Sequence, residues 1–487
     1  MNREPAAQPP GAPAPAAGAA EPPDPRRWKA LWVCLVAGFM TLLDVSIVNV
    51  ALPSIHTGLD ASPSELQWVV SGYALTFGLT LVPAGRLGDA LGRRTVFIVG
   101  VVLFGLSSLA CGLAPTSALL VAARLVQGAA GGILNPQVSG LIQQLFRGDE
   151  RGRAFGLLGA TIGISTAVGP VTGGLILDRL GAEHGWRWIF FVNLPVALAA
   201  VVLARRWLPD PPARDRSRRL ELDPVGVLLL GAAVLALLLP VVESGSASRS
   251  VSWWVAVAGL ALLGVFLLWE RREARHGREP VVDLHLFGVP GYAAGATVGT
   301  IYFAGFTGIF FVLTIHFQQA LGYSPLLAGL AVTPFAAGSA VSSALGGRLV
   351  SRWGRSLVTA GLAVVLVGLV ATDIVLDAVA GGASGWALAG PLLVAGIGSG
   401  FVISPNVTLT VADVPVARAG TAGGLLQTGQ RIGTAAGIAL VGSVFFASSP
   451  PDAGVALRVA AGLVALALVT SAVDVATRRR GTAPPAR

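Results

Sequence analysis

Two ionisable residues in long apolar segments, Asp44 and Arg124, are candidates for proton chemistry. A charge inside a membrane helix is costly unless it pairs or faces water, so such residues are functional candidates. Burial penalises the ionised form of the Asp44 carboxyl group, whereas a nearby cation such as Arg124 stabilises it. A carboxylate balanced between these effects can bind and release a proton as its access to water changes. The alternative for both residues is a fixed structural ion pair.

A charged, glycine-rich stretch at residues 85–94 (GRLGDALGRR) follows the second apolar segment. Its glycines permit a tight turn. A charged cluster that pairs in one conformation and separates in another can act as a gate, and the alternative is a solvated loop that only helps to set the topology. The candidate gating residues are Gly85, Arg86, Asp89, Gly92, Arg93 and Arg94.

Glycine and proline recur in two other apolar segments. Residues 124–132 (RLVQGAAGG) place glycines beside Arg124, where they let neighbouring helices approach closely. Residues 154–178 include Pro170, which removes a backbone hydrogen bond and bends a helix. A bend and a contact seam along which helices can slide are therefore predicted at Gly163, Gly169, Pro170, Gly173 and Gly174.

Further polar and aromatic residues in apolar segments are candidates for lining a substrate cavity. These are Asn49, Gln127, Asn135, Tyr302, Phe306, Asn406, Gln427 and Arg431. Asp373 and Asp377 lie one helical turn apart near a predicted helix end, so we expect them at the membrane interface. The sequence contains no metal-ligand cluster and no Gly-x-Ser-x-Gly turn, so neither a metal site nor an intramembrane hydrolase is supported.

The elements that must position these residues follow from composition. The chain of 487 residues is 54% hydrophobic and 12% charged, whereas soluble domains carry about 25% charged residues. Apolar segments long enough to span a bilayer recur from Leu31 onward. Cys34 and Cys111 lie in separate apolar segments and predict no disulfide framework. Lys29 is the only lysine and does not follow a phosphate-binding loop, which excludes an ATP-driven pump carrying its own nucleotide-binding domain.

An all-α membrane protein of about fourteen helices is expected. Basic residues gather on one side of this arrangement, and the other side carries only Arg179, Arg187, Arg249 and Arg458. The positive-inside rule then indicates an even helix number with both termini in the cytoplasm. The basic residues 214–219 fit that orientation signal, with contact to anionic lipid as the alternative. The predicted helices are 30–51, 66–86, 95–113, 117–142, 154–178, 188–206, 224–242, 251–269, 291–315, 325–349, 357–380, 386–412, 420–446 and 454–476.

The pattern of residues 85–94 recurs at residues 347–355 (GRLVSRWGR). Two six-helix units with an inserted helix pair between them explain this repeat. The predicted division is a disordered Pro/Ala-rich cytoplasmic tail (1–28), a six-helix bundle (29–206), a linker with two inserted helices (207–290), a second six-helix bundle (291–476) and a basic cytoplasmic tail (477–487).

From about residue 28 the chain resembles the major facilitator superfamily, specifically its fourteen-helix drug:proton antiporters of the EmrB/QacA type. The stretches that carry this resemblance are residues 43–53, 85–94, 124–132, 163–174 and 186–195.

The resemblance implies two pseudo-symmetric bundles and alternating access powered by inward proton flow. It implies that Asp44 takes part in coupling or cation recognition and that Arg124 takes part in proton transfer. Gly169 and Pro170 match the stretch associated with antiporters, which favours export. Ser46 stands where threonine is more usual, and Ser351 replaces an acid of the second loop copy, which argues against symmetric gating by both loops.

The expected function is proton-coupled export of small amphiphilic compounds (drugs, dyes or an endogenous metabolite) across the cytoplasmic membrane. The alternatives are a proton-coupled symporter that imports a metabolite and a transport-inactive membrane sensor. The expected partners are the substrate, protons and the lipid bilayer, and no nucleic acid. We expect no cofactor and no enzymatic activity, and we take the protein to be a monomer. The scarcity of embedded acids favours monocations or neutral amphiphiles over dications as substrates.

Overall fold

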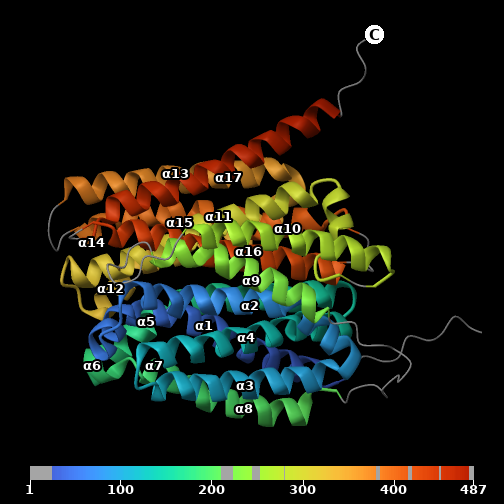
Figure 1. The fold of residues 1–487 in the computed structure, drawn as a ribbon, viewed down its shortest axis with the longest axis horizontal. Helices are drawn as coiled ribbons and strands as arrows, with labels where there is room; N and C mark the ends of the chain where they lie inside the picture. Colours follow the sequence, from blue (N-terminus) through green and yellow to red (C-terminus); the bar gives the residue numbers. More distant parts are fainter. Residues whose placement is uncertain are drawn as a thin grey trace, which may run out of the picture.

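A computed structural model describes residues 25–209, 223–243, 253–278, 280–379, 384–414, 419–448 and 451–481. These residues form helices and connections, with no β-strand among them. The long helices run side by side (Figure 1). Most of the predicted N-terminal tail (1–24), the basic residues 214–219 and the end of the C-terminal tail (482–487) lie outside the described residues.

The first bundle contains six long helices. These are α1 (Arg27–Leu59), α2 (Pro63–Leu91), α3 (Arg93–Leu113), α4 (Ser117–Leu145), α5 (Gly148–Leu180) and α8 (Asn193–Trp207). The predicted helix 188–206 was wrong in one respect, because α7 (Trp188–Phe191) ends before α8 begins, and α6 (Ala182–Gly185) precedes both. Pro195 explains the interruption, since it has no N–H group to donate to the Phe191 carbonyl.

The inserted pair and the second bundle follow in the predicted order. The pair consists of α9 (Pro224–Glu243) and α10 (Trp254–Arg275), which pack on each other. The bundle comprises α11 (Tyr292–Gln319), α12 (Pro325–Trp353), α13 (Arg355–Ala378), α15 (Ala389–Val411), α16 (Ala419–Phe446) and α17 (Ala453–Gly481), with the short elements η1 (Leu284–Gly288) and α14 (Ser384–Ala387).

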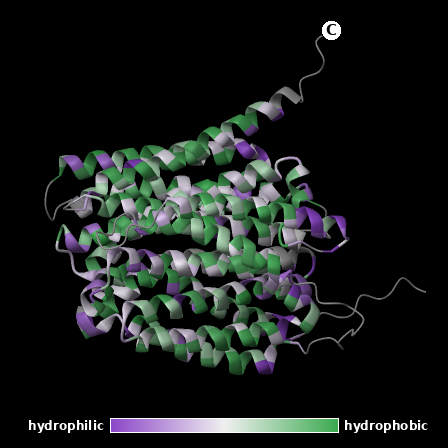
Figure 2. Ribbon diagram, in the orientation of Figure 1, coloured by the Kyte–Doolittle hydropathy of each residue, from purple (hydrophilic) through white to green (hydrophobic). Residues whose placement is uncertain are grey.

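The helices are suited to cross a membrane. Within the described ranges, twelve helical segments are long and apolar enough to do so. Two more long helices, α5 with 33 residues and α16 with 28, pack among them, which agrees with the predicted count of about fourteen. Hydrophobic residues dominate the middle of the bundle and hydrophilic ones gather at its ends (Figure 2). Helices such as α1 extend past the predicted segments because hydropathy marks only the part inside the lipid.

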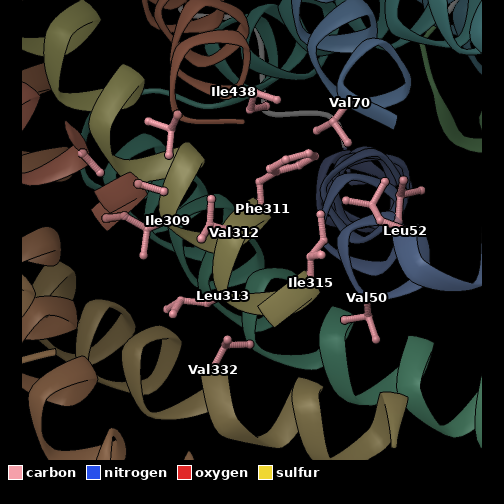
Figure 3. Close-up of a cluster of buried hydrophobic side chains, with 14 of the residues drawn as sticks. Val50, Leu52, Val70, Ile309, Phe311, Val312, Leu313, Ile315, Val332 and Ile438 are labelled. Carbon is pink, nitrogen blue, oxygen red and sulfur yellow. The ribbon is translucent and has the colours of Figure 1, made fainter. Parts of the chain in front are cut away.

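The two bundles meet tightly at the end that the charge pattern predicts to be extracellular. A buried apolar cluster there combines residues of α1 and α2 with residues of α11 (Figure 3). Val50 and Leu52 come from the first bundle, and Phe311 and Ile315 come from the second. Gln318 adds a polar link, because its Nε2 atom donates to the Val50 carbonyl at 2.8 Å. This end is therefore closed.

The helices α5 and α12 show the same asymmetry along their length. At the predicted outer end they touch, since a Cβ atom built on Gly174 would lie 2.5 Å from the Leu326 Cα. Toward the other end, Cβ atoms built on Gly156 and Gly347 would meet nothing within 4 Å. Along this helix pair the bundles are closed at the predicted outer end and packed less tightly toward the predicted cytoplasmic end, as an inward-facing arrangement requires.

Candidate functional site

The Asp44–Arg124 pair lies at the centre of the first bundle. The Arg124 Nη1 atom donates to the Asp44 Oδ2 atom at 2.6 Å, and neither side chain is exposed. Asp44 belongs to α1 and Arg124 to α4, so packing of these helices forms the pair. The structure thus places the two sequence-predicted proton-coupling residues in direct contact, and their role in coupling remains a prediction.

Amide side chains complete the surroundings of the Asp44 carboxylate. Its Oδ1 atom accepts hydrogen bonds from Gln127 Nε2 at 3.0 Å and from Asn193 Nδ2 at 2.8 Å. Gln127 also accepts from Arg124 Nη1 at 2.7 Å, and Asn193 Nδ2 donates to the Ser108 hydroxyl at 3.0 Å. Three side chains therefore donate to Asp44, which stabilises its ionised form against the cost of burial.

Arg124 makes further contacts with α2. Its Nε atom donates to the Val69 carbonyl at 3.0 Å, and its Cζ atom lies 4.2 Å from the centre of the Tyr73 ring. Its Nη2 atom has no hydrogen-bond partner among the described residues. One donor of this guanidinium is thus available to a new partner without breaking an existing contact.

Small residues hold α2 and α4 close enough for these contacts. A Cβ atom on Gly128 would lie 2.3 Å from the Tyr73 carbonyl oxygen, and one on Gly132 would lie 2.3 Å from the Phe77 carbonyl oxygen. The Thr76 hydroxyl donates to the Leu125 carbonyl at 2.7 Å across the same interface. The glycines after Arg124 thus position its side chain against α2. This agrees with the prediction that they let a neighbouring helix approach closely.

Removing the amide of Asn193 is expected to weaken this network. The Asn193→Ala variant loses a hydrogen bond to a charged group, so its free energy of unfolding should fall by about 1.5–3 kcal/mol. Thermal unfolding of the purified protein measures the change. Asn135→Ala is the matched control, because Asn135 is partly exposed and makes no hydrogen bond with the described residues. Equal destabilisation in both variants would contradict a specific role for Asn193.

The predicted gating residues form a set of separate contacts where α2 meets α3. Asp89 accepts from Arg93 Nη2 at 2.6 Å, and this pair is partly exposed. Arg86 donates to the Pro280 carbonyl at 2.5 Å, and Arg94 donates to the Arg205 carbonyl at 2.7 Å.

Two glycines fit this junction closely. Gly92 has a φ of 91°, which a side chain rarely tolerates. Gly85 lies near α4, with 3.8 Å between its built Cβ atom and Pro136. Among the contacts of the described residues, Asp89 thus pairs with Arg93, whereas Arg86 and Arg94 each donate to a backbone carbonyl.

The second loop copy is built differently. Ser351 donates to the nearby Arg348 carbonyl at 3.2 Å. Arg355 instead pairs with Asp474 of α17 at 3.0 Å, with both side chains 11% exposed. Arg355 Nη2 also donates to the Gly291 carbonyl at 2.7 Å. The acid missing from the loop is thus replaced by one from another helix, which agrees with the expectation that the two loops are not equivalent.

The glycines of α5 permit contact with α1. Cβ atoms built on Gly169 and Gly173 would lie 2.5 Å from Ser46 Cβ and 2.7 Å from Ile47 Cγ1, respectively. The Ser46 hydroxyl donates to the Thr166 carbonyl at 3.1 Å. The face of α1 that carries Ser46 and Ile47 therefore packs directly on α5, the helix for which a sliding contact was predicted.

The same stretch of α5 also contacts the second bundle. A Cβ atom on Gly329 of α12 would lie 2.4 Å from the Pro170 carbonyl oxygen, and Gly174 faces Leu326 as described above. α5 continues as one helix through Pro170. The surroundings of the Gly163 side-chain position lie outside what the structure describes. Residues 169–174 therefore connect α1 with α12.

The predicted cavity residues do not form one group. Gln127 belongs to the Asp44 network, and Tyr302 is fully buried with its hydroxyl group 2.7 Å from the Ser399 hydroxyl. Asn406 is 2% exposed and donates to the Gly295 carbonyl at 2.9 Å. The Phe306 ring stacks on Tyr302 at 5.6 Å. The predicted residues that keep partial exposure are Asn49, Asn135, Phe306, Gln427 and Arg431.

Three residues of the site were not among the sequence candidates. Asn193 lies in the stretch 186–195 that carried the resemblance, so its position near a motif was an available signal. Ser108 and Tyr73 had no such signal, because hydroxyl and aromatic side chains are ordinary in membrane helices. Asp373 and Asp377, expected at the interface, both accept hydrogen bonds from Arg458, each at 2.9 Å.

Comparisons with known proteins agree with this architecture. Residues 34–438 match the Major Facilitator Superfamily. The chain is 37% identical to a probable actinorhodin transporter of Streptomyces coelicolor over 88% of this chain and 74% of that protein. It is 32% identical to a tetracenomycin C resistance and export protein of Streptomyces glaucescens, covering 88% and 77% of the two chains.

Solved structures show the same fold at low sequence identity. A bacterial homologue of the human lysosomal transporter Spinster, in an inward-facing and occupied conformation, superposes with a TM-score of 0.65 at 16% identity over 95% of this chain and 100% of that chain. The xylose transporter XylE from E. coli gives a TM-score of 0.63 at 14% identity over 91% and 98%.

Proposed function

The chain belongs to the Major Facilitator Superfamily, and from that premise we propose that it exports small amphiphilic compounds in exchange for protons. The observation that supports the exchange most strongly is the fully buried Asp44 carboxylate, which accepts hydrogen bonds from Arg124, Gln127 and Asn193. This arrangement favours the ionised acid. Opening of the network would remove these donors and let water reach the carboxylate, which is the change that coupling requires.

Proton binding changes the local contacts in a defined way. A proton on Asp44 removes its charge and weakens its bond to Arg124, whose charge is then uncompensated. The Arg124 Nη2 atom has no partner within the described ranges and the guanidinium lies against the Tyr73 ring, so it can turn toward α2. A shift of Arg124 displaces α4 relative to α1, because the ion pair and Gln127 link these helices.

The same site can serve both sides of the membrane. In the inward-facing arrangement, the closed outer end separates the ionised Asp44 from the external water. Opening of the outer end would give Asp44 access to external protons, and return to the inward-facing state would release the proton into the cytoplasm. One proton moving down a potential of 100 mV supplies about 2.3 kcal/mol, enough for roughly 50-fold accumulation of a neutral substrate.

Export is favoured over the symporter and sensor alternatives. One of the two named relatives is a resistance and export protein, and the contacts at Gly169 and Pro170 join both bundles through the antiporter-like stretch. The proposal places the protein in the cytoplasmic membrane with both termini in the cytoplasm. It also includes the absence of an enzymatic activity and of a cofactor, since the proton gradient supplies the energy.

Inverted membrane vesicles test the proposal. Ethidium and the anionic dye anilinonaphthalene sulfonate serve as probes, with vesicles that lack the protein as the control. An acidic vesicle interior should drive dye uptake, which corresponds to export, and a proton ionophore should stop it. Uptake that persists after the gradient has collapsed would contradict proton coupling, and uptake driven by the opposite gradient would favour the symporter.

A further inference from the structure

Arg431 is a charged side chain in the middle of α16 that the proton-coupling site does not use. It lies about 18 Å along the helix from Ala419 at 1.5 Å per residue. The side chain is partly exposed and packs on α2, where its Cζ atom is 4.2 Å from the centre of the Phe77 ring. Its Cβ atom would lie 2.8 Å from a Cβ atom on Gly78. A positive charge thus lies at the contact between the two bundles.

This charge has no counter-ion within the described part of the chain. No carboxylate there forms an ion pair with Arg431, and the guanidinium donates no hydrogen bond to a described residue. Asp44 is already neutralised by Arg124. The Phe77 ring attracts the guanidinium but does not cancel its charge. A membrane-embedded cation is costly unless it is paired, so a partner from outside the chain would stabilise it.

Other polar groups near Arg431 also lack partners. Thr434 lies three residues further along α16, hence on the same face, and its buried hydroxyl group has no hydrogen-bond partner among the described residues. Gln427 lies one turn before Arg431 on that face and is partly exposed. The buried Tyr73 hydroxyl group, on the helix against which Arg431 packs, also has no hydrogen-bond partner among the described residues. Buried polar groups normally have partners, so these hydroxyl groups mark a place for a polar ligand.

We propose that Arg431 binds the acidic group of an amphiphilic organic anion during export. A guanidinium binds a carboxylate or sulfonate through paired N–H donors, and the apolar helix surfaces around it suit the rest of an amphiphile. A cationic compound is repelled at the same place. This inference rests on the proposed export function and names the substrate class. It names a class of substrate that lies outside the expectation of monocations or neutral amphiphiles over dications, which rested on the scarcity of embedded acids.

A charge series on one ring system tests the inference. The purified protein in nanodiscs is titrated with 2-naphthoate, its neutral isostere 2-naphthamide and the cation 2-naphthylmethylammonium, and binding is measured by isothermal titration calorimetry. The wild type should bind naphthoate about tenfold or more tightly than naphthamide, and ammonium most weakly. Arg431→Gln should remove this preference, and Arg431→Lys should retain part of it.

The controls separate charge recognition from folding and from transport. Arg458→Gln removes a cation that is already paired with Asp373 and should keep the naphthoate preference. Thermal unfolding shows whether each variant is folded, and Arg431→Lys keeps the test valid if Arg431→Gln is unstable. Binding of none of the three compounds, equal binding of all three, a preference for the ammonium compound, or a naphthoate preference that survives in Arg431→Gln each overturns the inference. Gradient-driven dye uptake would still stand in all four cases, so the two proposals can fail separately.

Discussion

Replacing Asp44 by asparagine is expected to abolish gradient-driven transport. Asparagine keeps the size of the side chain but cannot bind and release a proton, so the variant corresponds to a permanently neutral site. In inverted vesicles with an acidic interior, dye uptake should fall to the level of vesicles without the protein. Dye binding to the purified variant should persist, because Asp44 is fully buried in its network.

Two further variants separate coupling from structure. Asp44→Asn leaves the buried Arg124 without a counter-charge, which should lower the free energy of unfolding by about 3–5 kcal/mol. The double variant Asp44→Asn/Arg124→Gln removes both charges and should recover stability but not transport. Asp373→Asn, which alters an aspartate paired at the protein surface, should transport normally. Recovered transport in the double variant would identify the pair as structural.

Replacing Gly174 by leucine is expected to block the transport cycle in a different way. The new side chain would meet the Leu326 backbone at 2.5 Å, where no flexible group can move aside. Overpacking of this kind commonly costs about 1–3 kcal/mol. The closed outer end should therefore be destabilised, and transport should be lost even though Asp44 and Arg124 are intact.

Cysteine accessibility reports this shift directly. In a background without Cys34 and Cys111, a cysteine at the buried position Ile315 should react with an impermeant maleimide about tenfold faster or more when Gly174→Leu is present. Gly156→Leu is the matched control on the same helix, because a Cβ atom there meets nothing within 4 Å. Unchanged labelling in Gly174→Leu, or equal loss of transport in both variants, would contradict the proposed closure.

Much of the fold was predictable from the sequence because the membrane imposes simple rules. Long apolar segments predicted the helices. The repeat of residues 85–94 predicted the two bundles and the inserted pair between them. The cost of an embedded charge identified Asp44 and Arg124 before their contact was visible. Helix lengths were underestimated, since polar residues beyond the lipid continue helices such as α1 to Leu59.

Contacts between distant elements were not predictable in the same way. The bond from Asn193 to Asp44 joins residues of α8 and α1, and only the packing of the bundle brings them together. The pairing of Arg355 with Asp474 likewise replaces a missing loop acid with one from α17. Embedded charge marked Arg431 as a candidate, but the absence of a carboxylate partner among the described residues required the structure. Periodicity identifies elements, whereas side-chain partners depend on how those elements pack.

The exchange of protons for substrate can be measured directly in proteoliposomes that contain the pH-sensitive dye pyranine. A compound that the vesicle assay identifies as transported is added outside, with no initial pH gradient. Antiport predicts that inward movement of the compound drives protons out, so the interior becomes alkaline with the wild type and stays unchanged with Asp44→Asn. An interior that becomes acidic, or that shows no change while the wild type moves the compound, would contradict proton antiport.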